Sequence, residues 1–307
     1  MGLVPRRNRR HPMRIALPSH RDLPDWEVDD HPLHAALRAR GAVVEQPFWD
    51  EPGTAWSDFD AVLIRTTWNY QLKRDAFVAW AEHVESVTRL FNPARAVRWN
   101  THKSYLHDLA RRGARITPTV WLERGRRVDV ADLCATHCIA RGFLKPMVGA
   151  TARETLRFTT DESGLAAAQA HCDRLLPQEG LMLQPYRESV ESEGELSLLF
   201  VGGEAMHGVR KVPVPGDYRV QDDFDATDMP HEFTGEETAA LGHIVALAEA
   251  ELGLPARGLL YARVDVLRNP DGDLDLNELE IVEPSLFLRH GPRTAERLAE
   301  ALLARIR

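Results

Sequence analysis

Residues 261–281 read YARVDVLRNPDGDLDLNELEI, and this segment does most to decide the fold. Two runs of alternating apolar and polar residues flank Asp271-Gly272, a dipeptide typical of a two-residue hairpin turn. A turn there places Asp265 directly opposite Glu278 on neighbouring strands. Because side chains alternate between faces, the segment predicts a hairpin with one apolar face and one acidic face.

The acidic face of this hairpin is expected to need a cation. With the same turn, Arg263 lies opposite Glu280, on the face that carries Asp265 and Glu278. Like charges placed directly opposite each other are unfavourable unless they are compensated. Carboxylate oxygens are the donors that Mg²⁺ prefers, and Mg²⁺ commonly accompanies nucleotide phosphates. Two interpretations remain, a magnesium site and a solvated acidic face, and Pro270 leaves the register open by one residue.

Two lysines are suited to the phosphates of such a nucleotide. The chain has no GxxxxGK[ST] motif, which excludes a P-loop NTPase. Lys103 is expected in the first turn of a helix over 103–112, where the helix dipole favours anions. Lys145 ends an apolar strand and is followed by a loop of small residues over 149–152. Such a loop brings backbone N–H groups close to phosphate, while the lysine supplies a point charge.

The first hundred residues alternate between strand and helix patterns. Strands are expected at 15–17, 42–44 and 59–64, and helices at 31–37 and 75–87. This order indicates right-handed βαβ units on a parallel sheet. The segment from Arg65 to Tyr70 follows the third strand directly, and loops at the carboxyl ends of parallel strands commonly bind ligands. A capped turn with a packing tryptophan is the competing interpretation.

The rest of the chain changes to a mixed α+β pattern. Expected strands are 117–121, 143–146, 181–186, 195–201, 204–212 and the hairpin within 259–281, and expected helices are 103–112, 130–140, 236–252 and 294–306. The Gly202-Gly203 pair marks a turn between two antiparallel strands.

The composition excludes several classes of function. The 307 residues carry 38 Lys and Arg against 46 Asp and Glu, a formal charge of −8, which argues against a general nucleic-acid binder. No apolar run is long enough to span a bilayer, which excludes an integral membrane protein. Three cysteines and no signal-peptide pattern favour the cytoplasm. Residues 1–12, with four arginines and no acid, are expected to be a disordered leader or a cloning remnant.

The order of these motifs resembles that of the ATP-grasp superfamily, nearest the branch of glutathione synthetase and ribosomal-protein glutamate ligase. The resemblance covers residues 90–307 and is carried by Lys103, Lys145-Pro146, Gln184-Pro185-Tyr186, Glu195, Arg263-Val264-Asp265, Glu278-Leu279-Glu280 and Pro284. Two further segments, Arg65 to Tyr70 and Gly216 to Val220, resemble a bacterial subgroup that includes the cyclo-ligase of cycloserine biosynthesis, which closes O-ureidoserine.

The resemblance implies an ATP-grasp fold, α/β overall and α+β in the C-terminal part. An N-terminal parallel-sheet (pre-ATP-grasp) domain is expected over 13–98. A small ATP-grasp subdomain over 99–185 and a large one over 186–307 would then clamp ATP between them.

The resemblance also implies which residues bind ATP and metal. The implied ATP-binding residues are Lys103, Lys145, Gly149, Ala150, Thr151, Gln184, Tyr186, Glu188 and Glu193. Among these, the lysines hold the α- and β-phosphates, the loop over 149–151 covers the γ-phosphate, Gln184 and Tyr186 contact adenine, and one of the two glutamates reaches the ribose. Asp265, Glu278 and Glu280 are implied to bind two Mg²⁺ ions, with Mn²⁺ as an alternative. Relatives more often have asparagine where Glu280 stands, and their loops contain more glycine.

The implied reaction is an ATP-dependent ligation. A substrate carboxylate attacks the γ-phosphate to give an acylphosphate and ADP, and an amine-type nucleophile, in the same molecule or another, then displaces phosphate. The catalytic candidates are Arg263, Lys211 and Arg219, and the substrate-contacting candidates are Arg65, Thr67, Asn69, Tyr70, Arg219 and Glu283. For Arg263 an ion pair with Glu280 is the alternative role, and for the loop between Lys211 and Arg219 an ordinary surface loop. Arg65 and the basic residues of that loop remain competing clamps for the substrate carboxylate.

Two other functions remain open at this stage. One is an ATP-grasp phosphotransferase, and the other is a non-catalytic module that binds or senses nucleotides. Whether the protein is a ligase or a phosphotransferase, the expected partner is a small-molecule carboxylate. Neither a nucleic acid nor a membrane is expected as a partner. A homo-oligomer is compatible with the resemblance.

Overall fold

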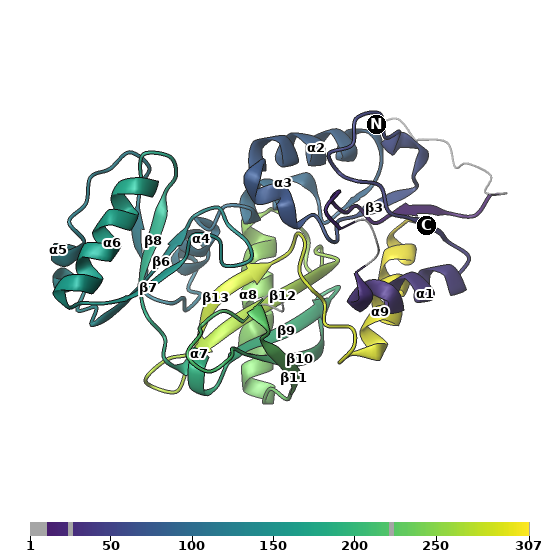
Figure 1. The fold of residues 1–307 in the computed structure, drawn as a ribbon. Coiled ribbons are helices and arrows are strands. Elements are labelled where there is room, and N and C mark those ends of the chain that lie inside the picture. Colours follow the sequence, from purple (N-terminus) through teal and green to yellow (C-terminus); the bar gives the residue numbers. More distant parts are fainter. Residues whose placement is uncertain (1–10, 24–26, 221–223, 307) are drawn as a thin grey trace.

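The computed structural model describes residues 11–23, 27–220 and 224–306, and Figure 1 shows three lobes, each built on its own sheet. Residues 1–10 of the expected leader lie outside the described residues. The predicted fold class is confirmed, because a parallel N-terminal sheet is followed by two antiparallel sheets with helices. In the described part of the chain, no helix is long and apolar enough to cross a membrane.

The N-terminal lobe is a parallel sheet in the order β2-β1-β3-β4. Its strands are β1 (Arg14–Ala16), β2 (Val43–Glu45), β3 (Ala61–Leu63) and β4 (Leu90–Phe91). Its helices are η1 (Val28–Asp30), α1 (His31–Ala39), η2 (Trp56–Asp58), η3 (Trp68–Leu72), α2 (Arg74–Val87) and α3 (Ala94–Asn100). The expected strands and helices are present, and β4, with two residues, is too short to leave a periodic pattern.

The C-terminal helix α9 (Pro292–Ile306) packs on this N-terminal lobe and also on the third lobe, which is described below (Figure 1). Leu298 and Leu302 lie four residues apart on one face of α9 and are fully buried. They belong to the same core cluster as Leu33 and Leu37 of α1. Burial of one leucine contributes about 1.5–3 kcal/mol, so this seam fixes the N-terminal lobe against the end of the chain.

The second lobe is an antiparallel sheet in the order β5-β8-β6-β7. Its elements are β5 (Val120–Leu122), α5 (Val130–Thr136), β6 (Arg141–Pro146), β7 (Leu156–Thr159), α6 (Glu162–Leu175) and β8 (Leu181–Pro185). The helix α4 (Tyr105–Arg111), which precedes this sheet in the chain, packs against the later helix α8 (Gly235–Glu251). Leu144 and Leu183 point into a core covered by α5 and α6. Because side chains alternate along a strand, Lys145 of β6 and Gln184 of β8 lie on the opposite face, toward the third lobe.

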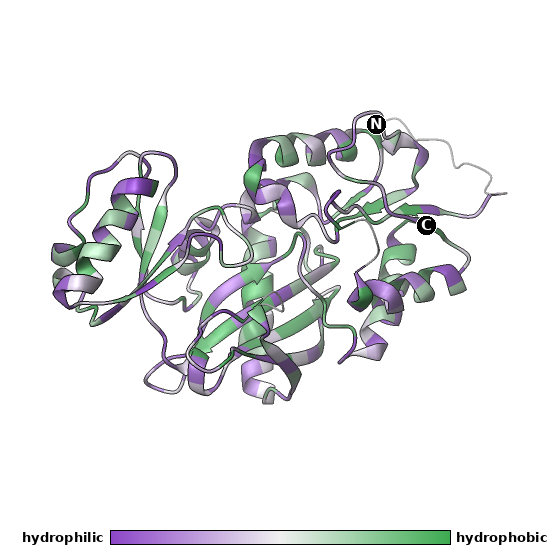
Figure 2. Ribbon diagram, in the orientation of Figure 1, coloured by the Kyte–Doolittle hydropathy of each residue, from purple (hydrophilic) through white to green (hydrophobic). Residues whose placement is uncertain are grey.

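The third lobe is an antiparallel sheet in the order β11-β10-β9-β12-β13, backed by α8 (Gly235–Glu251). Its strands are β9 (Glu195–Val201), β10 (Glu204–Val212), β11 (Thr227–His231), β12 (Tyr261–Arg268) and β13 (Leu274–Glu280), and α7 (Ser189–Ser192) precedes them. Val264 and Val266 of β12 pack toward α8, and hydrophobic residues run along these strands in Figure 2. The polar residues of the same strands therefore face the second lobe.

The hairpin of β12 and β13 has the predicted register at its acidic positions. Asp265 pairs with Glu278, as expected. Between Asp265 and Val266 the register shifts by one residue, which leaves Asn277 as an extra residue in β13. The predicted two-residue turn is wrong, because Pro270, Asp271 and Gly272 form a three-residue turn in which Gly272 has φ +89°. The bulge compensates for the longer turn, so the residues nearer the site keep the predicted register.

Candidate active site

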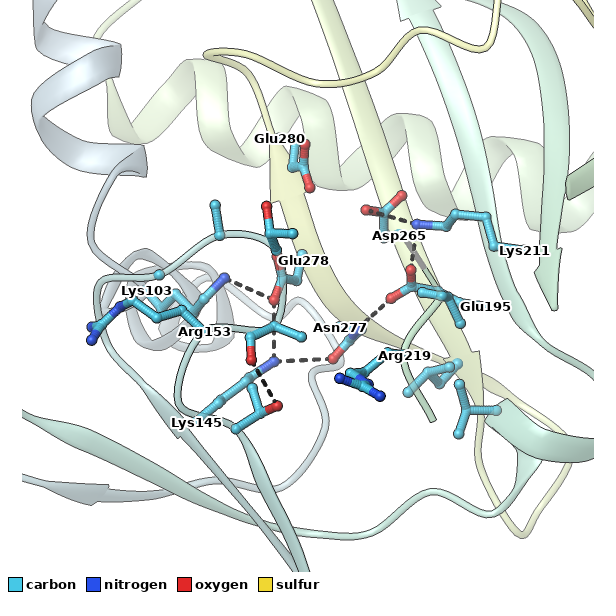
Figure 3. A pocket seen from close by; sticks show the side chains of 18 of the residues that line it. Lys103, Lys145, Arg153, Glu195, Lys211, Arg219, Asp265, Asn277, Glu278 and Glu280 are labelled. Atoms are coloured by element: carbon cyan, nitrogen blue, oxygen red, sulfur yellow. Dashed lines mark hydrogen bonds and ion pairs between the residues drawn. The ribbon is translucent and has the colours of Figure 1, made fainter. Parts of the chain in front are cut away.

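A cavity of about 350 Å³ lies between the three lobes, and Figure 3 shows part of its lining. The N-terminal lobe contributes Trp68 and Tyr70. The second lobe contributes Lys145, the turn before α4 contributes Lys103, and the sheet of the third lobe contributes Asp265. The cavity thus combines the residues of segments that are far apart in the sequence.

Two lysines, the buried Lys145 and the partly buried Lys103, converge on one carboxylate oxygen in this cavity (Figure 3). Lys103 Nζ lies 2.7 Å and Lys145 Nζ 3.4 Å from Glu278 Oε1. Lys145 Nζ also donates to Asn277 Oδ1 at 3.2 Å. Lys103 is not on a helix as expected, since α4 begins two residues later, and its own N–H donates to Met147 O at 2.7 Å. That bond ties the turn that carries Lys103 to the segment that follows Lys145.

The two lysines keep Glu278 ionised. Burial alone would raise the pKa of Glu278, but Lys103 and Lys145 outweigh it and lower that pKa to about 2. Burial also lowers the pKa of Lys145, although Glu278 opposes the shift. For Lys103 the attraction of Glu278 outweighs burial, and its pKa is raised. A group with more negative charge than Glu278 would therefore attract both lysines.

Asp265 lies at the centre of a second charged group. Arg263 Nε donates to its two carboxylate oxygens at 2.9 and 3.1 Å. Lys211 Nζ lies 3.5 Å from Asp265 Oδ2 and is also paired with Glu195, while Ser197 Oγ donates to Asp265 Oδ1 at 2.6 Å. Burial would raise the pKa of Asp265, but Arg263 and Lys211 outweigh it and hold that pKa below its ordinary value.

Two further carboxylates have raised pKa values. Burial raises the pKa of Glu280 to about 7, with Asp265 adding to the shift and Arg263, 2.5 Å away, opposing it. Burial and the nearby Glu280 raise the pKa of Glu283 to about 8, against the effect of a hydrogen bond with Tyr70. Burial at this end of the cavity therefore favours the protonated forms of both carboxyls.

The loop over 149–152 contacts the N-terminal lobe. The N–H of Ala150 donates to Gln71 Oε1 at 2.6 Å. Thr151 and Ala152 have φ values of 50° and 51°, in the left-handed region that costs residues other than glycine about 1–3 kcal/mol each. The contact with Gln71 helps to hold the loop over the cavity.

Replacing Gln71 with alanine is expected to raise the KM for ATP about 2- to 10-fold, the equivalent of one lost hydrogen bond. The expected change in kcat is smaller, because Gln71 holds the loop and does not line the cavity. Steady-state ADP formation measures both constants. Gln178→Ala, on an exposed side chain of the second lobe, is the matched control, and a KM equal to that of the control would contradict the expectation.

The other end of the cavity is apolar and aromatic. Gln184 Nε2 donates to Thr119 Oγ1 at 2.8 Å, which fixes the amide at the cavity wall. The ring of Phe143 lies 5.1 Å from that of Tyr218 and 6.3 Å from that of Tyr186, measured between centroids. An apolar wall with a few fixed polar groups suits a heteroaromatic ring such as adenine.

Fifteen of the residues proposed from the sequence line this cavity. They are Tyr70, Lys103, Lys145, Gly149, Ala150, Thr151, Gln184, Tyr186, Lys211, Arg219, Arg263, Asp265, Glu278, Glu280 and Glu283. Lys211 lies on β10 and is paired with Glu195, and the guanidinium of Arg219 is paired with Asp217 and lies 3.8 Å from the centre of the Phe224 ring. Their roles in catalysis remain predictions.

Five proposed residues are not among those that line the cavity, and their roles stay predictions. Glu188 and Glu193 point to solvent and pair with arginines outside the cavity. Thr67 is fully buried, and Asn69 accepts a hydrogen bond from Trp49 Nε1 at 2.7 Å. Arg65 is the fifth. The pattern after β3 was correct in placing a loop at the cavity, but only Trp68 and Tyr70 of that loop reach the cavity.

Arg65 has a structural role. Its side chain is 2% exposed and donates to both oxygens of Asp30, at 2.9 and 2.8 Å. A further N–H donates to Pro284 O at 2.9 Å. The guanidinium therefore joins the N-terminal lobe to the segment after β13, and Arg65 is not among the residues that line the cavity.

Replacing Arg65 with alanine is expected to lower the free energy of unfolding by about 3–5 kcal/mol, because Asp30 would stay buried without its partner. Equilibrium denaturation in urea measures the loss. Arg98→Ala is the matched control, since its partner Glu82 is half exposed and such pairs contribute about 1 kcal/mol or less. Equal losses in the two variants would contradict this role for Arg65.

Sequence reasoning missed two residues that contact the predicted ones. Asn277 accepts from Lys145 and donates to Glu195 because the bulge turns it to the same face as Glu278 (Figure 3). Ser285 lines the cavity, and its carbonyl accepts from Arg263 Nη1 at 2.9 Å. No residue type marks either position; the bulge could be found only from the turn length.

The carboxylates of the cavity were tested as a magnesium site. Among residues 11–23, 27–220 and 224–306, no three His, Cys, Asp or Glu side chains are close enough together to hold a metal ion. The reason is that Asp265, Glu278 and Glu280 are each turned toward a lysine or arginine. Their chemistry nevertheless fits Mg²⁺, because all three present carboxylate oxygens to one cavity from two adjacent strands.

Comparisons with known proteins agree on one family. Residues 15–92 match the family model described as the N-terminal domain of D-cycloserine synthetase DcsG. The chain is 34% identical to the cycloserine biosynthesis protein DcsG of Streptomyces lavendulae, over 95% of this chain and 96% of the relative. A crystal structure of D-cycloserine synthetase DcsG matches 96% of this chain and 100% of its own, with 32% identity and a TM-score of 0.85.

More distant structures share the fold. A D-alanine–D-alanine ligase from Bacillus anthracis, complexed with ATP, is 13% identical with a TM-score of 0.68 over 96% of this chain and 97% of its own. The ATP-grasp ligase PsnB, complexed with a minimal precursor, Mg and ADP, is 16% identical with a TM-score of 0.61 over 95% of this chain and 98% of its own.

Proposed function

The chain belongs to the DcsG family of ATP-grasp ligases, and we propose that it activates the carboxylate of a small amino-acid derivative and closes that molecule on one of its own nitrogens. It is an ATP-dependent ligase that forms a C–N bond and releases ADP and phosphate. The finer proposal, a cyclisation of an O-ureidoserine-like substrate, follows from the likeness to the cycloserine protein.

The convergence of Lys103 and Lys145 on one oxygen of Glu278 carries the proposal. The two cations come from separate segments and meet beside three carboxylates. That arrangement suits a ligand with several negative charges and an accompanying divalent cation, which together describe a magnesium–nucleotide complex.

In the proposed complex, Lys103 and Lys145 turn from Glu278 to the phosphates of ATP. The N–H groups of the loop over 149–152 cover the γ-phosphate, and Gln184 and Tyr186 contact adenine. Asp265, Glu278 and Glu280 would hold Mg²⁺, which neutralises phosphate oxygens. The number of ions proposed is two.

The reaction then needs positioning more than a protein nucleophile. A carboxylate oxygen of the substrate attacks the γ-phosphorus, the bond to ADP breaks, and an acylphosphate forms. The lone pair of the substrate nitrogen attacks the acyl carbon, phosphate leaves, and the nitrogen loses a proton. The guanidinium of Arg263, already at the cavity wall, is placed to stabilise the oxyanion of the tetrahedral intermediate.

The experiment is a screen for ADP release over amino acids, ureido-amino acids and small peptides, with mass spectrometry of the products. We expect ADP, phosphate and a cyclised product from O-ureidoserine. ADP and phosphate with other carboxylates alone would retain the ligase and reject the cyclo-ligase. ADP with a phosphorylated product would establish a phosphotransferase, and saturable ATP binding with no ADP over the whole panel would establish a binding module.

A further inference from the structure

The segment from Glu283 to Ser285, which follows β13, is held at each of its carbonyls. Trp68 Nε1 donates to Glu283 O at 3.0 Å. Arg65 donates to the next carbonyl and Arg263 Nη1 to that of Ser285, each at 2.9 Å. Three side chains from two lobes thus fix the position of this short segment at the cavity wall.

The side chain of Glu283 lines the cavity without a basic partner. Tyr70 lines the same cavity. In the described part of the chain no lysine, arginine or histidine forms an ion pair with Glu283. The nearby cations are engaged, Lys103 with Glu278 and Arg263 with two other acids.

Four other carboxylates of the cavity differ in this respect. Asp265, Glu278, Glu280 and Glu195 each have at least one lysine or arginine within ion-pair distance. A carboxylate at a cavity wall that lacks such a partner is suited to a cation carried by the ligand. The acceptors here are one carboxylate and one phenol oxygen, which suit the directed N–H donors of an ammonium group.

Arg263 lies at the other end of the same segment, where a substrate carboxylate would compete with Asp265 and Glu280 for its guanidinium. Its guanidinium binds Ser285 O, two residues after Glu283. In an α-amino acid the ammonium and the carboxylate are attached to one carbon. Glu283 begins this three-residue segment, and Arg263 binds its end. The two side chains are therefore suited to binding the ammonium group and the carboxylate of such a zwitterion.

We propose that Glu283 and Tyr70 form the subsite for the α-ammonium group of an amino-acid substrate whose carboxylate lies at Arg263. This inference rests on the proposed function, because it names the class of carboxylate that the ligase activates. It also assigns a role to the conformation of the Arg65–Tyr70 segment, which fixes the carbonyl of Glu283 through Trp68 and places Tyr70 at the wall of the same cavity.

The test compares O-ureidoserine with its des-amino analogue, 3-(ureidooxy)propionate, in the wild type and in Glu283→Gln. Binding to protein saturated with AMPPNP and Mg²⁺ is measured by calorimetry, and turnover is measured as ADP release. We expect the wild type to favour the ammonium-bearing ligand at least about 30-fold, and Glu283→Gln to lose most of that preference. The affinity of Glu283→Gln for AMPPNP is expected to stay within about 2-fold of wild type.

Two further variants make the outcome specific. Tyr70→Phe is expected to lose part of the preference, and Glu300→Gln, on α9 and paired with Arg40, is expected to keep all of it. If Glu283→Gln is unstable, Glu283→Asp, which retains the charge, should retain most of the preference. Equal affinities of the wild type for O-ureidoserine and its des-amino analogue would contradict the proposed subsite. A preference for O-ureidoserine that persists in Glu283→Gln would contradict it as well.

The two readouts separate this inference from the proposed function. Ammonium-dependent binding without any ADP release would support the subsite and contradict the ligase. Turnover of both ligands at equal rates would support the ligase and contradict the subsite. A wild type that neither binds nor turns over either ligand would contradict both.

Discussion

Replacing Asp265 with asparagine is expected to lower kcat for ADP formation about 100- to 1,000-fold. Asp265 is fully buried at the cavity wall and is held by Arg263, Lys211 and Ser197. In the proposed complex it binds Mg²⁺ and also fixes the guanidinium of Arg263, so one substitution weakens two sources of charge stabilisation. The asparagine also leaves Arg263 and Lys211 with less compensation, and a lower melting temperature is expected as well.

The control must separate lost stability from lost activity. Asp275→Asn serves this purpose, since Asp275 is a buried acid of β13, paired with Arg187 at 2.7 Å, that does not line the cavity. We expect both variants to melt at lower temperature, and only Asp265→Asn to lose activity by the stated factor at a temperature where both are folded. Similar activities in the two variants would remove Asp265 from the proposed metal site.

Replacing Lys145 with methionine is expected to raise the dissociation constant for an ATP analogue about 30- to 100-fold. Lys145 is 4% exposed, and its ammonium group is held at the cavity wall by Asn277 and Glu278. Burial strengthens the interaction of the ammonium group with phosphate, because the effective dielectric constant is lower there than in water. When ATP binds, the ammonium group exchanges a protein carboxylate for a more highly charged ligand. Calorimetry with AMPPNP and Mg²⁺ measures the change.

Lys73→Met is the matched control for this variant. Lys73 precedes α2, is half exposed, pairs with Asp50 at 2.8 Å and does not line the cavity. Methionine keeps the apolar part of either side chain, so packing changes little. An affinity of Lys145→Met equal to that of Lys73→Met would show that Lys145 does not contact the nucleotide.

The fold and the acidic hairpin could be predicted because their signals are local. Alternation along 261–281 determines which residues face the core, and it placed Asp265 opposite Glu278 correctly. The length of the turn depended on one residue, Pro270, and the added bulge at Asn277 had no sequence signal of its own. The bulge compensates for the turn, which explains why an error in the turn left the pairing of Asp265 with Glu278 unaffected but hid Asn277.

The loop after β3 shows where local patterns stop being sufficient. The polar residues of this loop all suited a substrate. In the structure, however, Arg65 donates hydrogen bonds to Asp30 and Pro284, and Asn69 accepts one from Trp49. These partners lie 20 or more residues away along the chain, and one of them lies 219 away. The burial of an arginine depends on such distant partners, and no spacing within the loop encodes them.

The separation of the carboxylates into paired and unpaired groups also depends on distant residues. Glu278, Glu280 and Glu283 are near neighbours in the sequence, but Lys103 neutralises the first, Arg263 the second and neither neutralises the third. The sequence could propose all three as functional residues. Their different partners are the basis for assigning the first two to magnesium and Glu283 to an ammonium group.

The most direct test of the proposed ligase follows the oxygen atoms of the substrate. The carboxylic acid that gives the fastest ADP release is prepared with ¹⁸O in both carboxylate oxygens, and the inorganic phosphate is examined by mass spectrometry. Activation through an acylphosphate predicts that one ¹⁸O atom appears in each phosphate released, together with one ADP. Phosphate without ¹⁸O, or ADP with the phosphoryl group retained on the product, would contradict the account.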